Sequence, residues 1–278
     1  MKWLQRIFDF YLDASVHVAF AIFALVKLTE ISFEISIQTH LSWFLFFGSI
    51  GCYNFIKYGL EAEKYLLVAN QYHKNIQVLS LATLALALYH SWFLNFETWM
   101  GIGCLLLLTG LYAIPVLPNA KNLRSWGGLK IFVVALVWSG STVVLPLLSA
   151  QQTITWDVSV EIIQRFVFVL VLLIPFEIRD LAYDKPELKT LPQRYGVART
   201  KTLGSLGAVL FFFLTFLKDD ISTTELVLKG ILFLILASVL FATKRNQSKY
   251  FASFWVEGIP VFWWVLALGL RQLFDKLV

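Results

Sequence analysis

Long apolar runs separated by short polar segments dominate the pattern of this 278-residue chain. We predict nine of the runs to be membrane-spanning helices, because about 20 apolar residues in a helix cross the hydrocarbon core of a bilayer. The short connections favour antiparallel neighbours, and so the pattern predicts an all-α, polytopic bundle that forms one domain over residues 1–278. The predicted spans are Ala14 to Leu28, Leu41 to Ile56, Ile76 to Phe93, Trp99 to Leu117, Leu129 to Ser149, Val158 to Phe176, Leu203 to Leu217, Leu226 to Thr243 and Phe254 to Leu270.

The composition also indicates a membrane protein. Hydrophobic residues make up 58% of the chain and the mean hydropathy is +0.71, which is more apolar than a soluble globular protein of ordinary composition. Charged residues amount to 15% and lie between the apolar runs, so the net charge of +5 bears on membrane topology and does not indicate a nucleic-acid partner. Cys52 and Cys104 fall inside apolar runs, and we expect neither a disulfide nor a zinc site.

The basic residues predict the orientation in the membrane. Most of the 23 Lys and Arg residues lie at the N-terminus or in the loops after the second, fourth, sixth and eighth predicted spans. The positive-inside rule then places the N-terminus and these loops in the cytoplasm and the C-terminus outside. We expect an integral protein of the bacterial inner (plasma) membrane.

An acidic stretch follows the sixth predicted span. It reads E-I-R-D-L-A-Y-D-K-P-E-L-K from Glu177 to Lys189 and continues as T-L-P-Q-R-Y-G. If the helix continues past Phe176, the side chains of Glu177, Asp180 and Asp184 lie at i, i+3 and i+7 and point to one face. Because a carboxylate that faces hydrocarbon is costly, we expect this stretch at the water interface or in a polar cavity.

The residue types in this stretch favour a magnesium site. Oxygen ligands suit a hard cation, and Mg²⁺ binds through one or two carboxylates together with phosphate oxygens of a substrate. Basic side chains nearby can donate charge-assisted hydrogen bonds to the same phosphates; they belong to Arg179, Lys185, Lys189 and Arg194. The alternative is a solvated loop of mixed charge.

The segment E-I-R-D-L-A-Y-D, the following K-T-L-P and a glycine four positions after that proline resemble the second aspartate-rich motif of the UbiA superfamily of membrane-embedded prenyltransferases. The family's usual glycine between the second aspartate and T-L-P is absent. The resemblance implies that Asp180 and Asp184 are catalytic metal ligands that bind Mg²⁺ and, through it, the diphosphate of an isoprenoid donor. Glu177, Arg179 and Lys189 lie in the same segment and are expected to bind the substrate.

The family has a first aspartate-rich motif at the end of its second helix. Here that region reads G-C-Y-N-F-I-K-Y-G-L-E-A-E-K, and Phe55, Tyr58 and Ala62 occupy the family's aspartate positions. The resemblance therefore implies that the first metal site is largely lost.

A polar face remains in this region. Asn54, Lys57, Tyr58 and Glu61 are at i, i+3, i+4 and i+7 of a helix. Lys57 can neutralise a diphosphate oxygen directly and replace part of the charge of a second Mg²⁺. We therefore expect Lys57 to be catalytic and Asn54 and Tyr58 to bind the substrate. The alternative is that Lys57 and Glu61 form an interfacial pair without a ligand.

Further candidates lie near the same membrane face. The loop after the fourth span resembles a family segment in which a tyrosine precedes a basic cluster; this resemblance implies a catalytic role for Tyr112 and substrate binding by Arg124 and Lys130, with interfacial anchoring as the alternative. Glu257 lies near the cytoplasmic start of the last span and is expected to face the pocket. His17 in the first span is expected to be a packing residue.

The favoured function is transfer of an isoprenoid group from a polyprenyl diphosphate to a lipophilic acceptor within the bilayer, with Mg²⁺ as cofactor and with the active site in the cytoplasm. Mg²⁺ and basic side chains would stabilise the leaving diphosphate. The rival is a non-catalytic UbiA-like protein that binds a lipid or a partner, and the altered first motif favours it. An ion-coupled transporter is disfavoured because no predicted span carries an acid near its middle.

Overall fold

The computed structural model describes residues 2–59, 71–113, 128–184 and 186–274. These residues form helices and no strand, so the predicted all-α fold is confirmed. In chain order the helices are α1 (Lys2–Asp13), α2 (Val16–Ser32), α3 (Thr39–Asn54), η1 (Phe55–Gly59), α5 (Gln71–Ser91), α6 (Phe96–Ala113), α7 (Lys130–Ser139), η3 (Gly140–Val144), α8 (Leu145–Ser149), α9 (Trp156–Asp180), η4 (Pro186–Leu188), α10 (Leu191–Phe213), η5 (Leu214–Leu217), α11 (Thr223–Ala242), η6 (Phe251–Val256) and α12 (Ile259–Phe274).

Each predicted span overlaps a helical segment of the bundle, and the chain is an integral membrane protein. Within the described residues, five helices are long and apolar enough to cross a membrane, or six if α1 and α2, which meet at 57°, form one bent crossing. The helices α3, α5 and α6 do not meet this criterion, although they coincide with predicted spans. The five crossings are Lys130–Ser149, Trp156–Asp180, Leu191–Leu217, Thr223–Ala242 and Phe251–Gln272.

The predicted start of the seventh span, Leu203, is wrong. Helix α10 begins well before it, at Leu191, because the preceding T-L-P-Q segment forms a helix start. The side chain of Gln193 accepts a hydrogen bond from the N–H of Thr190 at 3.0 Å, and Pro192 in the first turn needs no partner for its nitrogen. The chain then bends at Gly196, whose φ of 78° favours glycine.

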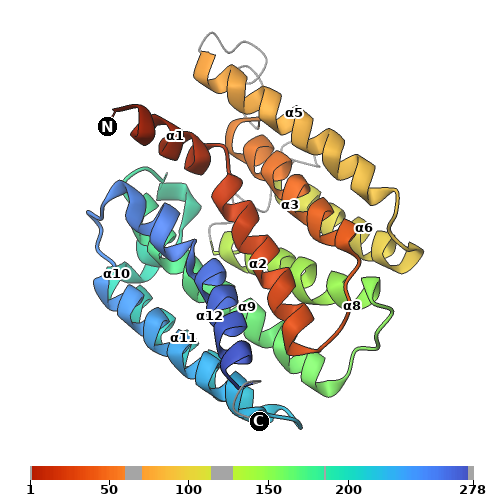
Figure 1. Cartoon of the computed structure of the whole chain (residues 1–278). Helices are drawn as coiled ribbons and strands as arrows, with labels where there is room; N and C mark the ends of the chain where they lie inside the picture. The colour runs from red at the N-terminus through yellow and green to blue at the C-terminus, as the bar shows by residue number, and fades with distance from the viewer. Residues whose placement is uncertain (1, 60–70, 114–127, 185, 275–278) are drawn as a thin grey trace.

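Helix α9 is the centre of the bundle. It packs against α7, α10 and α11 and also touches η3, η5 and η6. Thr155 caps its start by accepting a hydrogen bond from the N–H of Val158, and Phe168 in its middle is fully buried. Figure 1 shows α1 at one end of the bundle and the C-terminal end of α12 at the other. Since α9 spans the bundle, its two ends carry polar groups to opposite faces.

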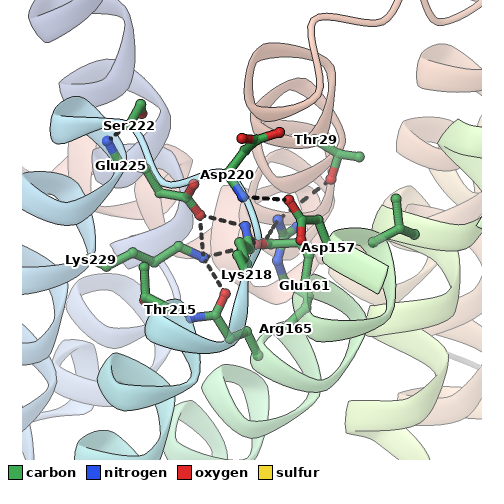
Figure 2. A network of polar contacts seen from close by, with 12 residues as sticks. Thr29, Asp157, Glu161, Arg165, Thr215, Lys218, Asp220, Ser222, Glu225 and Lys229 are labelled. Carbon is green, nitrogen blue, oxygen red and sulfur yellow. Dashed lines mark hydrogen bonds and ion pairs between the residues drawn. The ribbon is translucent and has the colours of Figure 1, made fainter. Parts of the chain in front are cut away.

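One end of α9 holds a buried ionic network, shown in Figure 2. The carboxylate of Glu161 lies 3.0 Å from the guanidinium of Arg165, 3.0 Å from the ammonium of Lys218 and 2.9 Å from that of Lys229. Glu225 contacts Lys218 at 2.5 Å. The network links α9 to the segment after α10 and to α11. The sequence analysis did not single out Glu161, Arg165 or Lys229, because it searched for acids near the middle of a span.

Arg165 extends the network to the first half of the chain. Its guanidinium donates hydrogen bonds to the carbonyl of Leu25 at 3.0 Å and to the hydroxyl of Thr142 at 3.2 Å. The Thr142 carbonyl in turn accepts a hydrogen bond from Thr29 at 2.6 Å. Helices α2, η3 and α9 are therefore connected by polar contacts in the interior, where such contacts are not weakened by water.

We predict that Glu161→Gln lowers the free energy of unfolding by about 3–5 kcal/mol, because it leaves buried cations without their carboxylate. Denaturation of the purified protein in detergent, followed by circular dichroism, measures the change. The matched control is Glu97→Gln, at an exposed position in the first turn of α6, which should change stability by less than about 0.5 kcal/mol. Equal stability of the two variants would contradict a structural role for the network.

Candidate functional site

The candidate site lies where α3 and α9 end and where α12 begins. Two π-helices border the site: η1 carries Lys57 and Tyr58, and η6 directly precedes Glu257. A π-helix is rare and is found frequently at functional sites, since it changes the direction of side chains within a helix. The site is thus built where regular helices are interrupted.

Asp13, at the end of α1, organises the η1 side of the site. Its carbonyl accepts hydrogen bonds from the ammonium of Lys57 at 3.1 Å and from the hydroxyl of Tyr58 at 3.0 Å. Its carboxylate accepts a hydrogen bond from the hydroxyl of Tyr72 at 2.7 Å and lies 3.8 Å from Lys57. Burial and the charge of Asp13 raise the pKa of both tyrosines, so both remain donors. The sequence analysis missed Asp13, although an acid directly before a predicted span was a usable signal.

The start of α2 contacts both α1 and η6 through His17. The Nε2 atom of His17 lies 2.9 Å from the carbonyl of Phe254 and therefore donates to it, so that Nδ1 accepts a hydrogen bond from the hydroxyl of Tyr11 at 2.8 Å. His17 is 5% exposed. Its predicted role as a packing residue is confirmed, and these contacts fix the segment that leads to Glu257.

Glu257 faces the cations of the site. Lys57 and Arg179 both lie close enough to interact with its carboxylate electrostatically, although neither forms an ion pair with it within 4 Å in the described residues. The structure therefore brings Lys57, Arg179 and Glu257 together from η1, α9 and the start of α12. The role of Glu257 in substrate binding stays a prediction.

The carboxylates at the end of α9 do not lie on one continuous helix. Helix α9 ends at Asp180, and the carbonyl of Asp180 accepts hydrogen bonds from the N–H groups of Tyr183 and Asp184 at 2.8 Å each. The helix therefore does not continue to Asp184, which was the condition for placing all three carboxylates on one helix face, because the chain turns after Asp180. Glu177 nevertheless interacts electrostatically with both Asp180 and Asp184, so the turn keeps the three carboxyl groups together.

The basic partners of these carboxylates differ. Asp180 accepts two hydrogen bonds from its neighbour Arg179, at 2.7 and 3.2 Å. Glu177 is 2% exposed; its Oε1 atom lies 3.4 Å from the ammonium of Lys130, and its Oε2 atom has no hydrogen-bond partner in the described part of the chain. A buried carboxylate oxygen without a donor is costly. Glu177 is thus poised for a further ligand, a cation or a proton.

The T-L-P-Q segment holds the turn that carries Asp184. The side chain of Gln193, whose Oε1 atom caps α10, donates through Nε2 to the carbonyl of Asp184 at 3.3 Å. The two halves of the motif singled out in the sequence therefore contact each other, and the start of α10 positions the second aspartate.

Four of the predicted site residues are not shown in the site. Asn54 is fully buried, and its amide group donates to the carbonyl of Ala14 at 3.0 Å and to the hydroxyl of Ser80 at 2.9 Å; its role in substrate binding stays a prediction. Lys189 is exposed and forms no ion pair with the described residues. The side chain of Tyr112 and all of Arg124 lie outside what the structure describes, as do Glu61 and Lys185.

The fit of Mg²⁺ depends on oxygens from a ligand. No three His, Cys, Asp or Glu side chains among the described residues are arranged to hold a metal ion. Mg²⁺, however, binds through one or two carboxylates plus substrate phosphates, and Asp180 and Asp184, supported by Glu177, match that donor set. The residues fit a single Mg²⁺ that arrives with a diphosphate.

An apolar cavity of about 220 Å³ begins next to this polar end. It lies between α3, α6 and α7, and Ile56, beside Lys57, is part of its wall. The polar atoms of Tyr53 and Trp138 in the wall are satisfied, because the indole N–H donates to the phenol oxygen at 2.5 Å. The cavity therefore suits a hydrocarbon chain whose charged head lies at Lys57.

Solved structures with a similar fold are known. A UbiA homologue from Archaeoglobus fulgidus bound to GPP and Mg²⁺ matches with a TM-score of 0.65 and 14% sequence identity, over 94% of this chain and 98% of that chain. The chain has the UbiA fold. The same UbiA homologue bound to DMAPP and Mg²⁺ matches with a TM-score of 0.62 and 15% identity, over 93% and 98% of the two chains.

A structure of digeranylgeranylglyceryl phosphate synthase also matches, with a TM-score of 0.54 and 17% identity, over 94% of this chain and 95% of that chain. No protein-family model and no curated protein sequence matches the chain. The likeness to UbiA homologues, predicted from the acidic stretch, is confirmed at the level of the fold.

We predict that Asn54→Leu lowers the free energy of unfolding by about 1–3 kcal/mol, because it removes two buried hydrogen bonds at similar side-chain volume. Thermal unfolding of the purified variant measures the change. Asn75→Leu, at an exposed position of α5, is the control. If Asn54→Leu unfolds like the control, the hydrogen bonds to Ala14 and Ser80 do not stabilise the fold.

Proposed function

We propose that the protein is a membrane prenyltransferase that transfers an isoprenoid group from a polyprenyl diphosphate to a lipophilic acceptor, with Mg²⁺ as cofactor. One observation carries the proposal: Asp180, Asp184 and Lys57 lie at one end of the bundle, and the wall of an apolar cavity includes Ile56, the residue before Lys57. The structures of UbiA homologues with GPP or DMAPP and Mg²⁺ support this choice of donor.

Different residues would bind Mg²⁺ and the diphosphate of the donor. Asp180 and Asp184 would hold Mg²⁺, which supplies positive charge that stabilises the leaving diphosphate. Lys57 donates to the diphosphate from the η1 side, and Arg179, oriented by Asp180, donates from the α9 side. Glu257 faces both cations and keeps them at this end of the bundle.

The apolar cavity completes the mechanism. The isoprenoid tail lies along Ile56 and past the hydrogen-bonded pair of Tyr53 and Trp138. When the allylic C–O bond breaks, the diphosphate keeps the electron pair and the acceptor supplies the pair for the new bond. Apolar walls exclude water from the cation-like centre, which would otherwise be hydrolysed. The side chains of Tyr112 and Arg124 are further candidates in this reaction.

The active site would face the cytoplasm of a bacterial inner membrane. The supporting observation is the concentration of Lys and Arg at the N-terminus and in the loops after the second, fourth, sixth and eighth predicted spans. The acceptor is a lipophilic molecule that reaches the site from the bilayer, and the single domain over residues 1–278 would contain the whole site.

A second candidate function is binding of a lipid or partner without catalysis. It is favoured by the loss of carboxylates from the first motif and by Lys57 and Tyr58, which both donate to the carbonyl of Asp13. In that case the R-D-x-x-x-D segment would be structural, with Asp180 serving only as the partner of Arg179.

We predict that Asp180→Asn lowers the rate of diphosphate release by about 10² to 10³, because one electrostatic contact to the transition state is lost. Melting temperature should stay near that of the wild type, since the Arg179–Asp180 pair is about a third exposed and such pairs contribute about 0–1 kcal/mol. The assay incubates the protein in lipid with radiolabelled geranylgeranyl or farnesyl diphosphate, with and without Mg²⁺.

The matched control is Asp219→Asn, an exposed position at the other end of the bundle, which should keep full activity. If the wild type has no Mg²⁺-dependent affinity for either diphosphate, and Asp180→Asn only lowers the melting temperature, the catalytic proposal is wrong and the binding protein remains.

The altered first motif predicts the metal content. We expect about one Mg²⁺ per bound diphosphate, because η1 offers an ammonium from Lys57 in place of carboxylates. Isothermal titration with a non-hydrolysable prenyl diphosphate at varied Mg²⁺ measures the stoichiometry, and Lys57→Asp should raise it by one ion. A wild-type complex with a full metal cluster bound by the end of α3 would exclude Lys57 as a substitute charge.

A further inference from the structure

A second, larger cavity lies at the end of the bundle opposite Asp180. Its volume is about 730 Å³, within the range of about 300–1,000 Å³ that is typical of ligand pockets. Asp157 in its wall belongs to the first turn of α9, so the helix places it about 34 Å from Asp180 at 1.5 Å per residue. This cavity is therefore separate from the proposed diphosphate site.

The floor of the cavity is basic. Lys218 and Lys229 are 7% and 2% exposed, and both ammonium groups share the Oε2 atom of Glu161 (Figure 2). With Arg165, the described network contains three cations and only two carboxylates, those of Glu161 and Glu225. Because unmatched buried charge is costly, an anionic group in the cavity would stabilise this floor.

The mouth of the cavity has the opposite charge. Asp157, Asp220 and Glu34 line it, and Glu34 is 80% exposed. The carboxylate of Asp157 accepts hydrogen bonds from the backbone N–H groups of Asp219 and Asp220, which fixes the acidic loop in place. Arg271, 3.9 Å from Glu34, is the one basic side chain among these described mouth residues. A complementary ligand carries its anion deep and its cation near the mouth.

The third feature of the cavity is an apolar wall. On α12, Arg271, Ala267 and Trp263 follow one another at four-residue spacing, so one helix face descends from the mouth to the interior in steps of about 6 Å. Ala267 and Trp263 are each 2% exposed, and Leu28 of α2 and Leu228 of α11 complete the wall. The cavity therefore combines an acidic mouth, a basic floor and an apolar wall that runs from the mouth to the interior.

We propose that this cavity binds a zwitterionic phospholipid from the leaflet on its side of the membrane. The phosphate lies at Lys218 and Lys229, the ammonium group lies among the carboxylates of the mouth, and the acyl chains run along Trp263. The ligand matches the reversal of charge and the apolar wall at once, and it connects α2, α9, α11 and α12. The site does not depend on the proposed transferase activity.

The test uses the full chain, purified in detergent and depleted of lipid. Native mass spectrometry and thermal unfolding are measured with dioleoylphosphatidylethanolamine, with dioleoylphosphatidylglycerol and with free O-phosphoethanolamine. Ala267→Trp fills the cavity without changing a charge, and Leu268→Trp, the next residue and 39% exposed, is its matched control. We expect one phosphatidylethanolamine on the wild type and on the control, and at least about tenfold weaker binding by Ala267→Trp.

A second variant tests the charge pattern without touching the packed interior. Glu34→Gln combined with Asp220→Asn removes two exposed mouth carboxylates, so affinity for phosphatidylethanolamine should fall and affinity for phosphatidylglycerol should rise. The proposal is overturned if Ala267→Trp retains lipid like its control, or if the mouth variant keeps the lipid preference of the wild type. It is also overturned if O-phosphoethanolamine alone stabilises the protein as much as the lipid does.

Discussion

Charge within the hydrocarbon layer must be compensated, and α9 carries charged side chains at both of its ends. Glu161 and Arg165 lie near its start, Glu177 and Asp180 lie at its end, and the residues from Phe166 to Phe176 are apolar and mostly buried. A helix of this length spans about 37 Å, so its polar ends reach opposite sides of the bilayer while its middle packs against α7, α10 and α11. Arg165, Lys218 and Lys229 compensate the first end, and Lys130 lies beside Glu177 at the second.

The two ends are compensated differently, and this difference separates structure from function. Glu161 contacts three cations within 3.0 Å, and both of its carboxylate oxygens have a partner. Glu177 has one ammonium at 3.4 Å and a second oxygen without a partner among the described residues, while Asp180 is paired with its own neighbour in the chain. A buried polar group that lacks a hydrogen-bond partner within the protein can bind a substrate or a metal ion instead.

The sequence predicted the contacts between residues that are close together in the chain. The R-D-x-x-x-D and T-L-P segments are close in the chain, and their contact through Gln193 follows from one turn between α9 and α10. Apolar runs gave the positions of the helices for the same reason. The contacts of Asp13 and Asn54 could not be predicted, because their partners, Tyr72 and Ser80, come from a distant helix, and a pattern along one helix does not show what another helix supplies.

The first motif has lost its carboxylates and contains Lys57, and this change affects the order in which a diphosphate and Mg²⁺ would bind. A site with two acidic motifs repels a bare diphosphate until metal ions have bound, because like charges at short range disfavour each other. In the proposed transferase, Lys57, whose side chain is 46% exposed, would attract the diphosphate before any metal is present, and Arg179 lies close enough to interact with Lys57. The diphosphate would then supply the oxygens that Mg²⁺ lacks on Asp180 and Asp184. Loss of one acidic motif is therefore compatible with catalysis, provided that the remaining metal ion enters together with the substrate.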